Sequence, residues 1–424
     1  MWKELKTIYK VCLESAAWYA AAAWMPWLSA SRFNVLESAQ KKALRIVCGL
    51  TKTAPKNCVY EEAEVVPIRV EAKRRSMICY EKAMRCGNED PRREICERQV
   101  DRRLKANKGW REQTRKATDE LGLWPREGGV YERMEPWKDV KDGGLVLNVE
   151  LNRKIRKDMA EVVRKGVVEE TLQKYEGWIK VYTDGSVEGG VQNGGAACVA
   201  SISGDRVVRR KAAGKWCSSY GAEAIALDEA LELVKERDWK EVVICTDSQA
   251  LVKRLGSRQI EKGAEMDRLK RKLMSISIGR RMVIQWVPGH CGVEGNEWAD
   301  REANLARSER QENVNIWMDA AKRRIEREVK YEVELDERLK KVYSKKIRRI
   351  ESNRKENVIV AQLRSGHCPK TKYYRHRIGM EYNAACEGCG EVQGKDHWVE
   401  CQATARHAMA EGFRWNSFGR RIGW

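Results

Sequence analysis

The chain has 424 residues and carries 82 Lys and Arg against 62 Asp and Glu, which gives a formal net charge of +20 at pH 7. Its length accommodates about two to four domains, and its 42% hydrophobic and 34% charged residues are typical of a soluble, charge-rich protein and argue against a membrane-embedded one. The excess of cations predicts a polyanionic partner, because Lys and Arg bind phosphates electrostatically. Ordinary solvated helix faces are the alternative interpretation.

The positive charge is distributed unevenly along the chain. Residues 1–120 carry 25 Lys and Arg against 16 Asp and Glu, whereas residues 177–306 carry 20 against 18. The basic surface is therefore predicted to lie mainly outside the segment 177–306.

The fourteen cysteines follow no spacing typical of secreted disulfide scaffolds, which predicts reduced thiols in a nuclear or cytoplasmic protein. An apolar stretch at residues 16–28 follows a basic start and resembles a signal peptide. However, Pro26 interrupts it, and it is too short to span a bilayer. A core helix is the preferred interpretation, and no membrane partner is expected.

Residues 1–120 show helical patterns and no catalytic spacing. Apolar residues at helical intervals predict a helix over 33–50, with Gly49 near its C-cap. Pro67 is placed to open the next helix, which stops near Gly87. Residues 121–176 are rich in Gly, Pro and Trp at first and are predicted to be a linker, with an amphipathic helix over 149–172.

Residues 177–307 are predicted to form an α/β domain with a mixed five-stranded sheet and helices on its faces. A Gly-rich turn spans 188–195, helices follow at 222–234 and near residue 300, and a basic helical segment spans 248–274. The predicted strands are 178–182, 196–202, 206–213, 242–245 and 282–287.

Four carboxylates occur in this domain in a suggestive order. Asp184 and Asp247 are each predicted to end a strand, Glu223 lies near the start of a helix, and Asp300 lies on the last helix. Taken singly, each acid is also explained as a cap or a surface residue. Together they predict a cluster that only cations neutralise, and a pair of divalent ions in such a cluster suits phosphodiester hydrolysis.

The segment combines Thr-Asp-Gly-Ser, an Ala-Glu helix, Thr-Asp-Ser-Gln and Gly-His-x-Gly-x-x-x-Asn-x-x-x-Asp, in that order. It resembles a type 1 ribonuclease H domain. The resemblance implies cleavage of the RNA strand of RNA–DNA hybrids, leaving 5′-phosphate and 3′-hydroxyl ends, with two Mg²⁺ ions or Mn²⁺ in their place. The implied metal ligands are Asp184, Glu223, Asp247 and Asp300.

The same resemblance assigns roles to residues around the four acids. His290, on a loop, is implied to assist proton transfer or product departure; an exposed loop histidine without a role is the alternative. Positions near the substrate in that family are matched by Gly185, Ser186, Ser248, Gln249 and Asn296.

The last third of the chain combines a charged segment with a Cys/His cluster. Residues 308–355 carry 15 Lys and Arg and 10 Asp and Glu, which predicts a helix that is either a solvated connector or a contact for nucleic acid. Residues 356–424 contain Cys386-x2-Cys389-x7-His397-x3-Cys401, a spacing that suits a tetrahedral Zn²⁺ site. Buried free thiols or a redox Cys-x-x-Cys pair are the alternatives.

The order of these segments resembles the C-terminal part of a non-LTR retrotransposon polyprotein, as in the trypanosomatid ingi-type elements. LESAQKKALRIVCGLTKTAP is similar to the thumb-like segment after the polymerase core, and the run from Leu363 to Pro369 is similar to the segment before a terminal CCHC zinc knuckle. By this likeness His367 and Cys368 lie outside the zinc site, and His407 is a conceivable substitute ligand.

The retroelement likeness implies a role in removing template RNA during reverse transcription. The expected partners are the RNA–DNA hybrid and, through the basic flanks and the zinc tail, single-stranded or duplex nucleic acid. A catalytically inactive, nucleic-acid-binding remnant is the alternative function.

Overall fold

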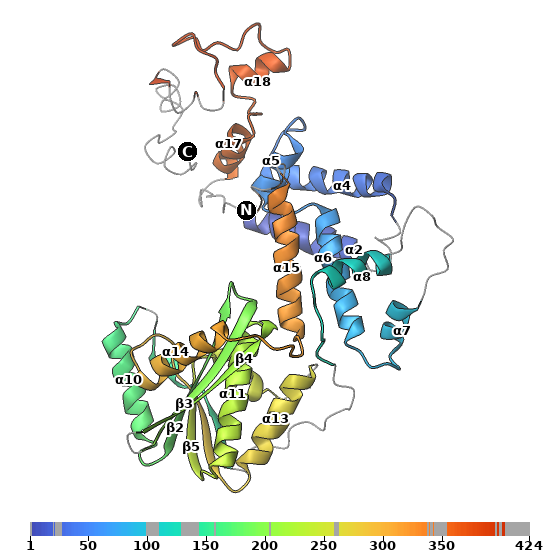
Figure 1. Cartoon of the computed structure of the whole chain (residues 1–424). Coiled ribbons are helices and arrows are strands. Elements are labelled where there is room, and N and C mark those ends of the chain that lie inside the picture. The colour runs from blue at the N-terminus through green and yellow to red at the C-terminus, as the bar shows by residue number, and fades with distance from the viewer. Residues whose placement is uncertain are drawn as a thin grey trace. The chain divides into compact units, whose positions relative to one another are not determined.

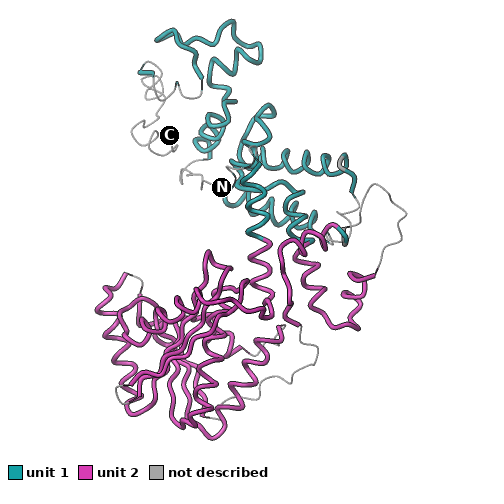
Figure 2. Tube along the Cα trace, in the orientation of Figure 1, with its two compact units in different colours: residues 1–76, 104–112, 326–424 teal, residues 77–103, 113–325 magenta. Residues whose placement is uncertain are grey.

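The protein is represented by a computed structural model that describes residues 2–19, 21, 28–98, 110–128, 144–156, 158–202, 205–257, 263–336, 339, 342, 354–394, 397 and 401–402. The chain divides into two compact units (Figure 2). Unit 1 comprises Met1–Ser76, Leu104–Glu112 and Glu326–Trp424, and unit 2 comprises Met77–Arg103 and Gln113–Ile325. Among the described helices, none has the length and apolar character needed to cross a bilayer.

Unit 2 is built on one mixed sheet with the strand order β1-β6-β5-β2-β3-β4 (Figure 1). β2, β3 and β4 form two antiparallel hairpins, while β5, β6 and β1 add parallel strands on the other side of β2. The mixed sheet with flanking helices is confirmed, and a sixth strand joins the five that were predicted. The strands are β1 Leu145–Asn148, β2 Ile179–Glu188, β3 Gln192–Ile202, β4 Asp205–Trp216, β5 Glu241–Thr246 and β6 Arg281–Trp286.

The sixth strand comes from residues that were predicted to be a linker. β1 pairs in parallel with β6, with Leu145 opposite Met282, and thereby covers an edge that would otherwise be open. The helix predicted over 149–172 is broken into α9 Leu151–Lys154 and α10 Glu161–Gln173. Leu151 and Val168 pack in one buried cluster, whereas a straight helix would hold residues 17 positions apart about 25 Å from each other. The chain therefore has to bend between them.

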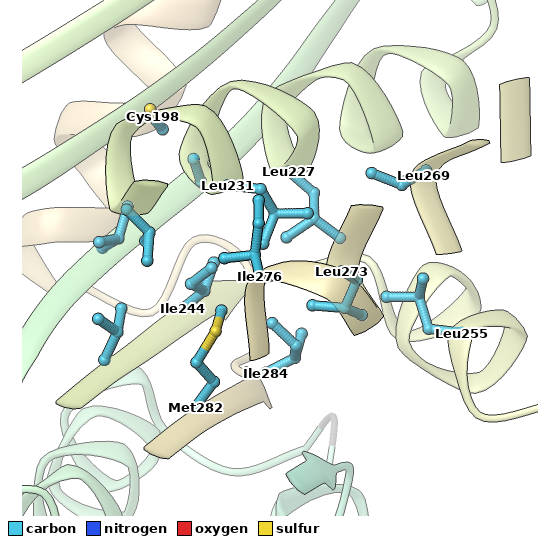
Figure 3. Close-up of a cluster of buried hydrophobic side chains, with 14 of the residues drawn as sticks. Cys198, Leu227, Leu231, Ile244, Leu255, Leu269, Leu273, Ile276, Met282 and Ile284 are labelled. Atoms are coloured by element: carbon cyan, nitrogen blue, oxygen red, sulfur yellow. The ribbon is translucent and has the colours of Figure 1, made fainter. Parts of the chain in front are cut away.

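Each face of the sheet buries its own apolar cluster. One face carries α11 Ser219–Glu236, α12 Gln249–Leu255 and α13 Ala264–Ser277, whose leucines pack on Ile244 and Ile284 (Figure 3). The other face carries α10 and α14 Glu294–Ser308, which pack on the alternate residues of the same strands. The segment predicted as one basic helix over 248–274 thus contains two helices.

A short segment after helix α8 Trp110–Glu120 ties upstream residues into the sheet domain of unit 2. The buried Glu127 carboxylate accepts hydrogen bonds from the backbone N–H of Glu265 (3.1 Å) and of Met318 (3.2 Å). It therefore caps the starts of α13 and of α15 Met318–Leu335. Arg126 forms a bidentate ion pair with the fully buried Glu81 on helix α6 Ile68–Met84.

Unit 1 brings together residues from both ends of the chain. Helix α4 spans Ala30–Cys48 with Ser29 as N-cap and Gly49, at φ 71°, as C-cap, which agrees with the helix predicted over 33–50. α17 Arg354–Arg364 packs on this end of α4: Gln362 Nε2 donates to the Gly49 carbonyl at 2.8 Å. The other described helices before α7 are α1 Trp2–Ile8, the π-helix η1 Tyr9–Glu14, α2 Ser15–Trp18, α5 Lys56–Ala63 and α6 Ile68–Met84.

The remaining described helices are short except for α15. α6 begins directly after Pro67 and ends before Gly87, as predicted. α15 falls within the charged segment 308–355 and buries the side chains of Ile325, Val329 and Val333. It is therefore not simply a solvated connector. The short helices are α7 Pro91–Glu97 and α18 Lys372–Arg377.

Candidate active site and metal centre

Three of the four predicted acids meet in unit 2. One carboxylate oxygen each from Asp184, Glu223 and Asp247 lies within 4.8 Å of the others. The register explains the meeting, because Thr183 on β2 lies opposite Thr246 on the parallel strand β5, which places the following acids side by side. The prediction that Asp184 ends a strand is wrong: β2 continues to Glu188, because its second half pairs with β3.

Glycine at position 185 permits the third acid to approach. A Cβ atom on Gly185 would lie 2.3 Å from the backbone nitrogen of Glu223 and 2.5 Å from the carbonyl carbon of Ala222. Only glycine therefore allows the first turns of α11 to pack directly on β2. This close packing places the Glu223 carboxylate next to that of Asp184.

Asp300 lies beside the three acids without belonging to the 4.8 Å group. It projects from α14, is half-buried, and accepts a hydrogen bond from Asn304 Nδ2 at 3.1 Å. Asn304 Oδ1 in turn accepts from Ser186 Oγ at 2.8 Å. This chain of hydrogen bonds fixes the orientation of Asp300 relative to β2.

Glu297 is a fifth acid near the site, and it is not among the acids predicted from the sequence. It lies one turn before Asp300 on α14, and its charge contributes to raising the pKa of Asp184. The sequence contains a signal that would have identified it, because residues three apart on a helix share a face.

Burial and mutual repulsion make the site unfavourable for ionised carboxylates. Burial, followed by the charges of Asp247 and Asp300, raises the pKa of Asp184 to about 7. Burial raises the pKa of Glu223 well above its usual range, and the Asp247 and Asp184 charges add to this. Burial also raises the pKa of Asp247.

Divalent cations fit this donor set. Glu223 Oε2 is buried and has no hydrogen-bond partner among the described residues. A carboxylate oxygen left without a donor, next to two further acids, suits Mg²⁺, which prefers oxygen ligands. Asp184, Glu223 and Asp247 are the residues that would hold such an ion, with Asp300 adjacent.

In the absence of a bound cation, the folded chain should lose stability as the pH rises from about 4 to about 7. Over this window Asp184 keeps its proton in the folded state, with a pKa of about 7, but loses it when unfolded, with its ordinary value of 3.8. The folded state then binds more protons than the unfolded state, so stability falls with rising pH. Thermal unfolding in EDTA, compared between wild type and Asp184→Asn, measures the effect. Parallel pH curves for the two proteins would contradict it.

His290 lies on the loop after β6, next to the acids. Its backbone has φ 50° and its side chain is exposed. A Cβ atom on the preceding Gly289 would lie 2.5 Å from Asp247 Oδ2, so this loop passes against that carboxylate. The charge of His290 also lowers the pKa of Asp247, which opposes the effect of burial.

The remaining predicted contact residues surround the same acids. Ser186 accepts a hydrogen bond from Arg307 as well as donating to Asn304. Ser248 occupies the N-cap position of α12, and Gln249 Oε1 accepts from Lys253 Nζ at 2.9 Å. Within the described part of the chain, Gln249 Nε2 and Asn296 Oδ1 are buried without a hydrogen-bond partner.

The Cys/His cluster lies in unit 1. Ligand atoms of Cys386, Cys389, His397 and Cys401 all lie within 4.8 Å of one another. The Sγ atoms of Cys386 and Cys401 are 3.9 Å apart, and Cys389 Sγ is 3.6 Å from His397 Nε2. Tetrahedral Zn²⁺ with ordinary bond lengths requires about 3.8 Å between sulfurs and about 3.6 Å between sulfur and nitrogen. The donor set therefore fits one zinc ion.

The local chain around Cys386 has the form of a tight metal-binding turn. Gly388 N–H points at Cys386 Sγ at 3.4 Å, and Gly390, at φ 76°, donates its N–H to the Cys386 carbonyl. His367 is buried elsewhere, with Nδ1 3.0 Å from Thr53 Oγ1. His367 and Cys368 do not belong to the cluster, and His407 lies outside the described residues.

Comparison with known proteins identifies the sheet domain. The family model described as RNase H matches residues 176–308, so this part of the chain is an RNase H domain. No curated protein matches the chain.

Solved RNase H structures match about a third of the chain. The N-terminal RNase H domain of Rv2228c from Mycobacterium tuberculosis, solved as a fusion with maltose binding protein, is 22% identical over 34% of this chain and 96% of that chain, with a TM-score of 0.27. RNase H1 from Halobacterium salinarum is 24% identical, and the match covers 31% of this chain and 97% of that chain, with a TM-score of 0.26. LC11-RNase H1, solved in complex with an RNA/DNA hybrid, is 20% identical. The match covers 31% of this chain and 99% of that chain, also with a TM-score of 0.26.

Proposed function

We propose that the RNase H domain at residues 176–308 is an endonuclease that hydrolyses the RNA strand of RNA–DNA hybrids with two divalent ions, Mg²⁺ or in its place Mn²⁺. The observation that carries the proposal is the group of Asp184 and Glu223, which are buried, and Asp247, which is half-buried; the pKa values of all three are raised. Three acids this close together, with one buried oxygen without a donor among the described residues, repel one another when ionised, so either protons or bound cations must neutralise them.

The fourth acid supports two ion positions. Asp184 lies within the group of three and is also influenced by the charge of Asp300, which lies outside that group. The Asp300 charge also raises the pKa of Asp247, so the fourth acid is near two members of the group, and we assign to Asp184 the role of the ligand that both ions share. Two bound ions would supply an activated water and neutralise charge on the phosphate.

Residues of the chain itself supply the remaining functions. Asn304 holds Asp300 in orientation through its side-chain amide. His290, exposed beside Asp247, is placed to exchange a proton with the departing 3′-oxygen. Gln249 and Asn296 are assigned to the recognition of the 2′-hydroxyls by which RNA differs from DNA. Gly185, Ser186 and Ser248 complete this proposed substrate surface.

The test is cleavage of an RNA–DNA hybrid by the full-length chain, with the RNA end-labelled. We expect RNA fragments with 5′-phosphate and 3′-hydroxyl ends in Mg²⁺ and no cleavage in EDTA. An RNA duplex and a DNA duplex of the same sequence serve as controls and should stay intact. Binding of the hybrid without cleavage in Mg²⁺ or Mn²⁺ would favour the alternative function, an inactive nucleic-acid-binding remnant.

The Cys/His cluster is proposed to hold one structural Zn²⁺ ion through Cys386, Cys389, His397 and Cys401. The spacing of its ligand atoms supports this assignment. The tail would then present a zinc knuckle to single-stranded or duplex nucleic acid, together with the basic flanks.

A retroelement context is the wider proposal. It is supported by the order of a helical thumb-like segment at 1–120, a segment at 121–176 that contributes β1 and α10 to the sheet domain, the RNase H domain at 177–307, a charged helical segment at 308–355 and a Cys/His tail at 356–424. In that context the enzyme would remove template RNA during reverse transcription, in the nucleus or the cytoplasm.

A further inference from the structure

A second site lies in unit 2 where strand β4 ends. A pocket of about 280 Å³ opens there, with Trp216 from the end of β4, Trp124 from the segment before the RNase H domain, and Arg324 from α15 in its lining. Lys215, Glu120 and Glu312 complete its polar part. Two of its main residues, Trp124 and Arg324, therefore come from outside the matched RNase H region 176–308.

The pocket pairs indole rings with cations. The Arg324 guanidinium lies 4.8 Å from the centre of the Trp216 ring, and Lys215 Nζ lies 5.6 Å from it. The Arg126 guanidinium lies 5.4 Å from the Trp124 ring, but it is ion-paired with Glu81 and does not line the pocket, so Arg324 and Lys215 are the cations of this pocket. Arrangements of this kind bind bases, because the ring stacks on the base while the cation attracts the neighbouring phosphate.

The exposure of Trp124 indicates a surface that receives a ligand. Its side chain is 70% exposed, although it is among the largest apolar groups in the chain. Glu120 and Glu312 also line the pocket, so a purely anionic ligand such as free phosphate is poorly suited. A ligand with one aromatic face and one phosphate satisfies the rings and the cations together, and a nucleotide has this composition.

The position of the pocket places it within reach of a strand bound at the acids. Trp216 is three residues before Ser219, where α11 begins, and Glu223 is four residues further along that helix. The extended part spans at most about 10 Å and the helical part about 6 Å, so the two Cα atoms lie within about 16 Å. The backbone of the pocket residue Trp216 therefore lies within about 16 Å of the backbone that carries Glu223, a span of about five bases at a rise of about 3.4 Å per base.

We propose that this pocket stacks an unpaired base of a single strand that continues beyond the RNA–DNA hybrid. Base pairs inside the hybrid are stacked on both faces and offer none to an indole ring, whereas every base of a single strand does, so we assign the pocket to a single-stranded extension. The site would direct the RNase H domain to junctions between hybrid and single strand. The distance argument depends on the proposed active site, whereas binding at the pocket is measurable without cleavage.

The test is equilibrium binding of full-length protein in EDTA, followed by fluorescence anisotropy. The first probe is a blunt 16-base-pair RNA–DNA hybrid. The other probes are the same hybrid with a single-stranded extension at one strand end, tested at each end in turn, and the extension is either six thymidines or six abasic residues. We expect a thymidine extension at one end to tighten binding by at least roughly fivefold. Trp124→Ala should abolish that gain and leave the affinity for the blunt and abasic probes unchanged.

Two further variants separate stacking from general effects. Trp124→Phe keeps an aromatic ring and should retain part of the gain, and Tyr382→Ala, which removes a fully exposed aromatic residue in unit 1, should retain all of it. The proposal is overturned if Trp124→Ala leaves the thymidine gain intact, or if it weakens all probes equally. If the protein binds the extension as expected but does not cleave hybrids, the proposed enzymatic function is contradicted and the proposed base-stacking site is still supported.

Discussion

An Asp184→Asn variant should lose hybrid cleavage by on the order of a thousandfold or more in Mg²⁺. Asp184 is the acid that we propose the two ions share, because it belongs to the group with Glu223 and Asp247 and the charge of Asp300 helps to raise its pKa. Its loss would then remove a ligand from both proposed ion positions. The measurement is the single-turnover rate on a labelled hybrid. Unchanged Mg²⁺-dependent cleavage in this variant would contradict the assignment of the active site.

The loss of activity should occur without loss of folding. Asp184 is buried, and burial and the neighbouring acids raise its pKa to about 7, so the neutral amide relieves repulsion in the metal-free protein. In EDTA at pH 8 the variant should therefore unfold at the same temperature as wild type or higher. Asp205→Asn, which changes an exposed acid at the start of β4, is the matched control and should retain full activity.

A Cys386→Ser variant of the full-length chain should lose its zinc. We expect about one zinc ion per wild-type chain by elemental analysis and almost none in the variant, because a hydroxyl does not replace a thiolate as a ligand for this metal. Cys386 is buried, and its sulfur lies 3.9 Å from Cys401 Sγ and receives the Gly388 N–H. Freshly prepared, reduced wild-type protein without zinc would refute the assignment.

The zinc prediction has a matched control in the same unit. Cys368 is also buried, but it lies outside the cluster of four ligands, so Cys368→Ser should retain zinc. Hybrid cleavage should persist in Cys386→Ser, because the four acids all lie in unit 2. Loss of zinc from both variants would indicate general unfolding of unit 1 instead of loss of a ligand.

Local patterns were enough to predict much of the RNase H domain. The five strands, the helix that carries Glu223 and the helix that carries Asp300 each have a periodicity visible within about ten residues. Asp247 was placed correctly at the end of a strand, because the buried run before it is short and uniform. The four cluster residues of the tail were identified by their spacing alone.

Non-local contacts decided the features that were missed. Nothing near Asp184 shows that β2 continues through it, since this depends on pairing with β3. Likewise β1 is a strand only because β6 offers it an edge. The packing of α17 on α4 joins residues more than 300 positions apart.

The sequence by itself determined the four acids and the four Cys/His residues of the candidate sites and the order in which they occur, because residue type and spacing are local properties of the chain. Only the tertiary structure decided that Asp300 stands beside the group of three acids and not within it. It also decided that Trp124 meets Trp216 in one pocket. These relations depend on the packing of helices against the sheet. This packing is the sum of many weak contacts, so no single position in the sequence indicates it.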